Sequence, residues 1–183
     1  MTQRPLRNDK LHRMEFITSM YKKIMYKKII YIDLDRTFLD YDAAIKSALN
    51  RFPAQPFPQS RIGFFRDLKP YPDAIDAVLE LDNRDDIDVY FLTAPSVLNL
   101  HCYTEKVECI VRLLGDEWAE RVIISTRKDL CIGDLLIDDC EVGAGQEVWQ
   151  ERGKLIKCAV SPEVETGDFY DWSEANSVIK RFL

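Results

Sequence analysis

The sequence contains no apolar run that approaches the roughly 18 residues of a membrane-spanning helix. Near its start it also lacks the apolar segment and small-residue cleavage site that are typical of a secretory signal peptide. These absences exclude the simplest patterns of a membrane protein and of an exported protein. We therefore expect a soluble, cytoplasmic protein that has no membrane partner.

Histidine is scarce, and cysteine shows no pairing pattern. The 183 residues include two histidines and five scattered cysteines, with no CxxC motif. An odd number of scattered cysteines argues against a disulfide scaffold or a zinc site and favours reduced thiols in a cytosol. His12 lies in the N-terminal segment and His101 follows the second predicted strand, so we expect neither to be catalytic.

Positive charge is scarce outside the first 28 residues. That segment holds eight Lys or Arg and two acidic residues, whereas the rest of the chain holds 17 basic and 29 acidic residues. The acidic remainder argues against a nucleic-acid duplex as partner. We predict that residues 1–24 form a basic, disordered extension, with a transit peptide as the alternative. The pentapeptide MYKKI occurs twice in residues 20–29 and leaves the true start of the chain open.

The remaining chain, with 46% hydrophobic residues overall, is long enough for one domain with a real core. Short apolar segments predict strands, and patterns of helical period alternate with them. The predicted strands are 29–32, 87–92, 122–124, 135–137 and 155–160, and the predicted helices are 41–52, 72–81, 95–114 and 172–183. This alternation predicts an α/β domain over residues 25–183, with a Rossmann-like, doubly wound parallel sheet covered on both faces.

A small helical cap is predicted after the first strand, at about residues 40–68. Its helix ends at the proline-rich connection of residues 53–63. Phe64 and Phe65 follow this connection, where they are placed either to stack on a substrate base or to form the core of the cap. The sequence leaves both roles open.

Polar side chains follow four of the predicted strands. In chain order they are Asp33, Asp35 and Thr37, then Thr93, then Lys128, and then Asp138 with Asp139. Ligands of doubly wound sheets bind at the carboxyl ends of the strands. We therefore expect these side chains to share one crevice. Taken singly, the first group would also fit a strand-to-turn junction, and Thr93 would also fit a helix cap.

Several carboxylates in one crevice repel one another unless a cation lies among them. Because oxygen ligands favour Mg²⁺, we predict a magnesium site formed by Asp33, Asp35, Asp138 and Asp139. Which member of the last pair contacts the metal directly is left open. A carboxylate that attacks a phosphate also needs counter-charge, since like charges 4 Å apart repel by about 4 kcal/mol at an effective dielectric of about 20. Lys128 can supply that charge.

The spacing of the two first acids suggests a division of work. Asp33 is the candidate nucleophile, and Asp35 is placed to protonate the leaving oxygen and later to activate water. Thr93 and Ala94, with backbone amides at a predicted helix N-terminus, are expected to hold the phosphoryl oxygens together with Lys128.

In this order, the four clusters resemble the motifs of the haloacid dehalogenase superfamily of phosphatases. The stretches GFFRDLKPYPDAIDAV, FLTAPS, YTEKVECIVRLLGDEWAERVIIS, GDLLIDD and FYDWSEANSVIKRFL are similar to its 5'(3')-deoxyribonucleotidase branch, from about Tyr26 to the C-terminus. The resemblance implies a Mg²⁺-dependent phosphomonoesterase that dephosphorylates nucleoside 5'(3')-monophosphates, deoxyribonucleotides among them. It implies a phospho-aspartate intermediate on Asp33, with Asp35 as the general acid and base.

The sequence departs from this family at three places. Arg36 replaces the usual glycine, where it would bend the loop differently, present a cation to the phosphate or pair with a surface acid. The run Ser125–Lys128 differs from the usual threonine-arginine-aspartate-lysine, so Arg127 is only a candidate for a phosphate contact. The short cap keeps other phosphorylated metabolites and macromolecular phosphates open as substrates. A non-catalytic phosphate-binding module is a further alternative, and a homodimer is one option for the oligomeric state.

Overall fold

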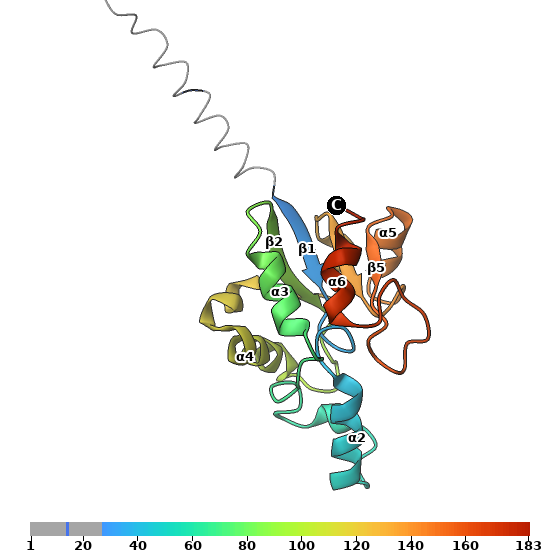
Figure 1. Ribbon diagram of the computed structural model, residues 1–183. Helices are drawn as coiled ribbons and strands as arrows, with labels where there is room; N and C mark the ends of the chain where they lie inside the picture. Colours follow the sequence, from blue (N-terminus) through green and yellow to red (C-terminus); the bar gives the residue numbers. More distant parts are fainter. Residues whose placement is uncertain (1–13, 15–26) are drawn as a thin grey trace, which may run out of the picture.

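The structure, a computed structural model, describes Met14 and residues 27–183 (Figure 1). The predicted basic extension lies outside the described residues except for Met14, as do His12 and the first copy of MYKKI. Within the described part, no helix is long and apolar enough to cross a membrane. All five cysteines are in the described part and are free.

A five-stranded parallel sheet forms the centre of the fold. Its strands are β1 (Lys28–Ile32), β2 (Ile87–Thr93), β3 (Val122–Ile124), β4 (Leu135–Asp138) and β5 (Leu155–Lys157). Their order in the sheet is β3-β2-β1-β4-β5, and every neighbouring pair is parallel. The strand order reverses direction at β1, which is where ligands bind in sheets of this kind. The predicted Rossmann-like α/β fold is confirmed.

Alternate residues of β1 supply the two faces of the sheet. Ile30 and Ile32 are fully buried in the larger hydrophobic cluster, whereas Tyr31 packs in a second cluster with Leu92 and Trp149. Burial on both faces explains why the strands are nearly continuous apolar runs.

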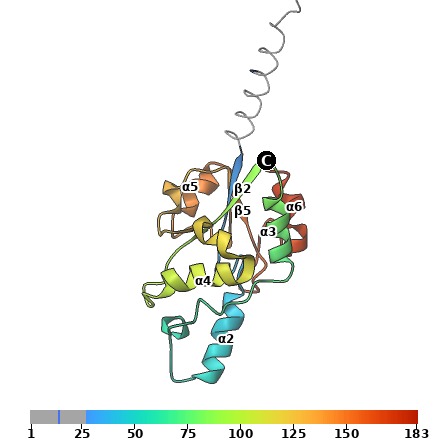
Figure 2. The ribbon, with the colours of Figure 1, turned by 90° about the vertical axis from the view of Figure 1, so that its left-hand side faces the viewer.

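Helices cover both faces of the sheet (Figure 2). On one face lie α3 (Ala74–Asp82) and α6 (Trp172–Ile179), and on the other lie α4 (Cys102–Leu114) and α5 (Gln146–Glu151). The short helix α5 was not predicted from the sequence. Two 3₁₀ helices, η2 (Asp116–Arg121) and η3 (Lys128–Leu130), flank β3.

Residues 40–68 project from the carboxyl end of the sheet (Figure 1). They contain α2 (Tyr41–Arg51) and the 3₁₀ helix η1 (Pro58–Ser60). Although α2 forms where the sequence predicts a helix, none of its residues is buried, and Leu49 on its apolar stripe is 37% exposed.

The helix that was predicted to begin at Pro95 begins at Cys102 instead. In the intervening loop, the backbone N–H of His101 donates to Asn99 Oδ1 and that of Ser96 donates to Cys102 Sγ. Such local bonds compete with helix formation. The sequence pattern predicts an apolar stripe of Val107, Ile110, Val111 and Leu114 on this helix. Of these only Ile110 is buried and the others are partly buried, whereas the remaining buried residues are Cys102, Glu105, Lys106 and Cys109.

The buried face of the sheet makes a testable contribution to stability. Ile87→Ala, at the fully buried start of β2, should lower the free energy of unfolding by about 2–5 kcal/mol because it leaves a cavity in the core. Leu79→Ala is the control on α3, where the side chain is 41% exposed, and its effect should stay below about 1 kcal/mol. Urea denaturation measures both, and equal effects would contradict the assignment of the core.

Candidate active site

The register of β1 and β4 brings two predicted site residues together. Ile32 pairs with Ile137, and the N–H of Asp33 donates to the carbonyl of Ile137 at 2.9 Å. Asp33 and Asp138 therefore leave the sheet side by side. The ammonium group of Lys128 lies between them, 2.6 Å from Asp33 Oδ1 and 2.5 Å from Asp138 Oδ2. All three side chains are at least nine-tenths buried.

Helix α5 and the residues just before it form hydrogen bonds to this charged group. Trp149 Nε1 donates to the carbonyl of Lys128 at 3.0 Å, and Gln146 Nε2 donates to Asp138 Oδ2 at 3.2 Å. The N–H of Lys128 also donates to the carbonyl of Ala144 at 2.7 Å. Neutral groups on α5, and on the residues just before it, thus hold both Lys128 and Asp138 in place. The sequence did not predict this helix.

A second buried lysine joins the other two predicted catalytic residues. Lys106 on α4 is completely buried, and its Nζ lies 2.9 Å from Asp35 Oδ2 and 2.7 Å from Thr93 Oγ1. The third ammonium proton can be donated to the carbonyl of Ala94, which lies 2.8 Å away. An ammonium group has three protons, so these partners use its whole donor capacity.

Lys106 was not predicted from the sequence as a site residue. A signal was present, since Lys106 stands four residues after Cys102 and four before Ile110, on the helix face that these apolar residues share. The predicted stripe of Val107, Ile110, Val111 and Leu114 suggested a buried face centred on other residues.

The electrostatics of these pairs follow from burial and from neighbouring charge. Burial lowers the pKa of Lys128, but Asp33 and Asp138 outweigh it, and the net direction is upward. Lys128 therefore stays charged. Burial raises the pKa of Asp35, and the charge of Lys106 opposes this effect without cancelling it. Burial and the charge of Asp33 likewise raise the pKa of Asp138.

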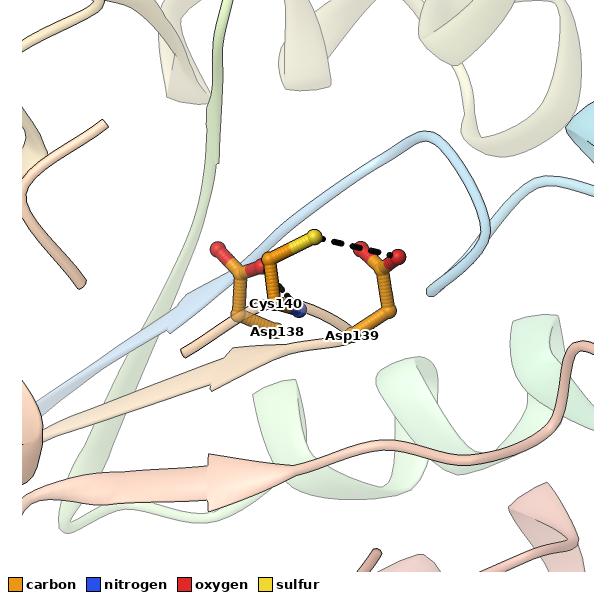
Figure 3. A group of neighbouring side chains, drawn as sticks. All are labelled: Asp138, Asp139 and Cys140. Carbon is orange, nitrogen blue, oxygen red and sulfur yellow. Dashed lines mark hydrogen bonds between the residues drawn. The ribbon is translucent and has the colours of Figure 1, made fainter. Parts of the chain in front are cut away.

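Asp139 and Cys140 complete the end of β4 (Figure 3). Burial and the charge of Asp33 raise the pKa of Asp139 to about 6. Cys140 Sγ lies 3.4 Å from Asp139 Oδ2, and burial with the nearby acids raises the pKa of this thiol to about 12. Asp138, Asp139 and Cys140 each offer one atom to a common group, within 4.8 Å of one another. With the thiol neutral, the ready ligands are the two carboxylates.

The charges of the site suit a divalent cation. Four carboxylates, those of Asp33, Asp35, Asp138 and Asp139, share this edge with two buried lysines. In addition, Asp35 Oδ1 is buried and has no hydrogen-bond partner among the described residues. A group of oxygen donors in which carboxylates outnumber the buried cations is what a hard cation such as Mg²⁺ requires.

The role of Arg36 was open, and the structure shows it in a surface ion pair. Its backbone has φ 63°, the left-handed conformation that glycine adopts without strain. Its Nε donates to Asp42 at 2.8 and 3.1 Å, and its guanidinium lies 5.5 Å from the centre of the Tyr41 ring. The loop therefore keeps a glycine-like bend although it carries an arginine. Arg127 is likewise paired with an acid, Asp129, and its side chain is 62% exposed.

Phe64 and Phe65 pack with Tyr41 into one aromatic group beside Lys106. The Tyr41 and Phe64 ring centres are 5.6 Å apart, and those of Phe64 and Phe65 are 5.1 Å apart. Lys106 Nζ lies 5.2 Å from the centre of the Phe65 ring. Phe64 also lines a cavity of about 530 Å³ between α2 and residues 61–69. The aromatic group thus lies between this cavity and the ammonium that holds Asp35.

One expectation about the phosphate site is wrong. The amides that follow Thr93 do not lie at a helix N-terminus, because α4 begins at Cys102 and residues 95–101 form a loop. Nor is Thr93 a helix cap, since it is the last residue of β2. Thr37, the third polar residue after β1, is buried, and its hydroxyl has no partner within the described part of the chain.

The raised pKa of Asp139 predicts how the stability of the metal-free protein, measured with a chelator present, depends on pH. An unfolded Asp has a pKa near 3.9, whereas the pKa of folded Asp139 is about 6, so folding takes up a proton between these values. The free energy of unfolding should therefore fall as the pH rises from about 4 to about 6, by up to about 2–3 kcal/mol at 1.36 kcal/mol per pH unit.

Asp139→Asn should reduce this pH dependence in urea titrations, leaving the part due to Asp35 and Asp138, whereas Asp116→Asn, at an exposed position, should leave it unchanged. Added Mg²⁺ should stabilise the wild type at pH 8 more than it stabilises Asp139→Asn. An identical Mg²⁺ response in both proteins would contradict a metal site at Asp139.

Comparisons with known proteins agree with the sequence resemblance. No family model matches the chain. The human 5'(3')-deoxyribonucleotidase of the cytosolic type is 42% identical over 85 residues, which cover 46% of this chain and 42% of that protein. The human mitochondrial 5'(3')-deoxyribonucleotidase is 26% identical over 139 residues, or 60% of this chain and 61% of that protein. The matched stretches thus cover less than two thirds of either relative.

A solved structure supports the fold independently. The crystal structure of a Burkholderia xenovorans protein described as a haloacid dehalogenase-like hydrolase matches with a TM-score of 0.53. The match covers 85% of this chain and 98% of that one, at 13% sequence identity, a level at which the fold alone is compared. The chain thus shares its fold with a haloacid dehalogenase-like hydrolase and is similar in sequence, over about half of its length, to 5'(3')-deoxyribonucleotidases.

Proposed function

We propose that the protein is a Mg²⁺-dependent phosphomonoesterase that hydrolyses nucleoside 5'(3')-monophosphates, deoxyribonucleotides among them, through a phospho-Asp33 intermediate. One observation carries the proposal. Two buried lysines gather the polar ends of the three central strands, with Lys128 joining Asp33 to Asp138 and Lys106 joining Asp35 to Thr93. The relatives named as deoxyribonucleotidases support the same chemistry.

In this proposal Asp33 is the nucleophile. Its carboxylate attacks the phosphorus atom, and the bond between phosphorus and the ester oxygen breaks. The positive charge of Lys128, 2.6 Å from Asp33 Oδ1, offsets the repulsion between the carboxylate and the phosphate. Because Asp33 is buried beside Lys128 and Asp138, its position is fixed before the substrate arrives.

Asp35 serves as the general acid and then as the general base. Its raised pKa favours the protonated form that can give its proton to the leaving oxygen. The resulting carboxylate then takes a proton from the water that attacks phospho-Asp33. Lys106 fixes Asp35 Oδ2 at 2.9 Å, so it acts as a positioning residue in this step.

Asp33, Asp138 and Asp139, with the backbone of Asp35, are the residues that would hold Mg²⁺. The bound cation would supply positive charge for the phosphoryl oxygens. Thr93, Ala94 and Lys128 are proposed to contact the phosphate, as is Arg36 once it leaves Asp42.

The substrate class rests on the aromatic group beside the site. Phe64 lines the cavity under α2, and in this proposal its ring contacts the nucleobase. That cavity is open, so another phosphorylated metabolite or a macromolecular phosphate is the alternative substrate, and a non-catalytic phosphate-binding module is the alternative from another class. Cytoplasmic location and a homodimer remain predictions from the sequence.

A substrate panel tests the function. With Mg²⁺, the protein should hydrolyse nucleoside 5'- or 3'-monophosphates with kcat/KM at least tenfold above that for sugar phosphates and phosphopeptides, because only nucleotides carry a base for Phe64. Phosphate release is the measurement. A preference for sugar phosphates or phosphopeptides would favour the alternative substrates, and tight Mg²⁺-dependent phosphate binding without release would favour the binding module.

Single substitutions test the assigned roles. Asp33→Asn should lower kcat by about 10³-fold or more because it removes the nucleophile. Asp35→Asn and Lys106→Met should each lower kcat by about 10²–10⁴-fold, the usual contribution of a positioned acid or base. Asp116→Asn is the exposed control. Steady-state kinetics at saturating Mg²⁺ measure kcat for each variant. An active Asp33→Asn enzyme would rule out the phospho-Asp33 intermediate.

A further inference from the structure

Glu105 is a buried carboxylate that the proposed reaction does not use. Its side chain lies in the first turn of α4, and the residue is only 3% exposed. A buried carboxylate is costly unless hydrogen bonds satisfy it. The N-terminal end of a helix gives some compensation through its dipole, so the remaining partners should reveal what the residue does.

Three donors from two loops point at this carboxylate. The N–H of Gly63 donates to Oε1 at 2.6 Å, and the N–H of Phe65 donates to Oε2 at 3.1 Å. The side-chain amide of Asn99 lies 3.4 Å from Oε2, and the same amide donates to the carbonyl of Arg61 at 3.0 Å. Both oxygens of Glu105 are therefore committed to residues 61–65 and to the loop that precedes α4.

The backbone held in this way presents the aromatic group. Gly63 has φ 88°, a left-handed conformation that turns its N–H and that of Phe65 toward the same carboxylate. Between these two amides stands Phe64, which lines the 530 Å³ cavity. The hydrogen bonds to Glu105 thus hold the backbone on both sides of Phe64, a residue that lines the cavity.

The neighbouring residue on α4 has a separate task. Lys106 holds Asp35 and Thr93, whereas Glu105 holds the loop of Phe64 and Phe65. Two consecutive residues of one helical turn therefore serve the reacting groups and the aromatic loop respectively. A change at Glu105 should alter which substrates fit, whereas a change at Lys106 should alter the reaction with every substrate.

We propose that Glu105 is a positioning residue for substrate selectivity, which favours monophosphates with an aromatic base by fixing residues 63–65 against α4. This inference rests on the proposed function. It concerns the ratio between substrates rather than the rate of the chemical step, because Glu105 contacts none of the groups assigned to that step.

Glu105→Gln is the sharpest substitution. It keeps the size of the side chain but replaces one acceptor oxygen with an NH₂ group, which then faces the N–H of Gly63 or Phe65. One of the two backbone bonds is lost, and a donor is placed against a donor. Glu108→Gln is the matched control, since Glu108 lies on the same helix at an exposed position.

The experiment compares a nucleoside monophosphate with glycerol phosphate, which has no base. In Glu105→Gln, KM for the nucleotide should rise about tenfold, the equivalent of one lost hydrogen bond, while kcat stays within twofold. The kcat/KM for glycerol phosphate should stay within twofold. Glu108→Gln should match the wild type on both, and Lys106→Met should lose activity on both. An equal loss on both substrates in Glu105→Gln, or an unchanged nucleotide KM, would overturn the proposal.

A second measurement does not depend on turnover. Amide hydrogen exchange of a peptide covering residues 61–68 should be faster in Glu105→Gln than in the wild type, and exchange over β4 should be unchanged. If Glu105→Gln does not fold, Asn99→Ala, which removes the third donor, should show the same changes more weakly. A wild type that hydrolyses neither substrate would refute the proposed function. Unchanged exchange at residues 61–68 would refute the role of Glu105 alone.

Discussion

Negative charge at the carboxyl edge of a parallel sheet has to be compensated before that edge can be buried. In this protein the register of β1 and β4 places Asp33 and Asp138 next to each other, and the following residues add Asp35 and Asp139. Two fully buried lysines compensate part of the negative charge of the four carboxylates. The remaining negative charge makes the edge suited to a cation and to a phosphate held through one.

The helices on one face of the sheet contribute to this charge balance as well as to the core. Helix α5 fixes Lys128 and Asp138 through Trp149 and Gln146, and α4 delivers Lys106 and Glu105 from one turn. Each of these four side chains is buried because a polar partner satisfies it. Lys106, which contacts Asp35 and Thr93, and Glu105, which contacts residues 63–65, are thus neighbours on one helix.

The strands and their polar ends could be predicted from the sequence because burial on both faces makes apolar runs, and parallel pairing brings their ends together. Asp33, Asp35, Thr93, Lys128 and Asp138 were predicted in this way to share one edge of the sheet, and two buried lysines join them there in the structure. Lys106 and Glu105 were not, because a helix with charged residues on its buried face has a hydrophobic pattern that points elsewhere. Helix α5 was not predicted because, at six residues, it is too short to show a helical period in the sequence. Arg36 could not be placed because its partner, Asp42, is set by the bend of the loop.

The long separation along the chain between the members of the site has a consequence for biosynthesis. Asp33 and Lys128, which share one hydrogen bond in the folded protein, are 95 residues apart. At roughly 5–20 residues per second of synthesis, Asp33 leaves the peptidyl transferase centre roughly 5–20 s before its partner exists. Throughout that interval β1, the central strand of the sheet, has no β4 to pair with. The nascent chain therefore carries an apolar strand with at least one unpaired edge, the kind of segment that is prone to aggregate.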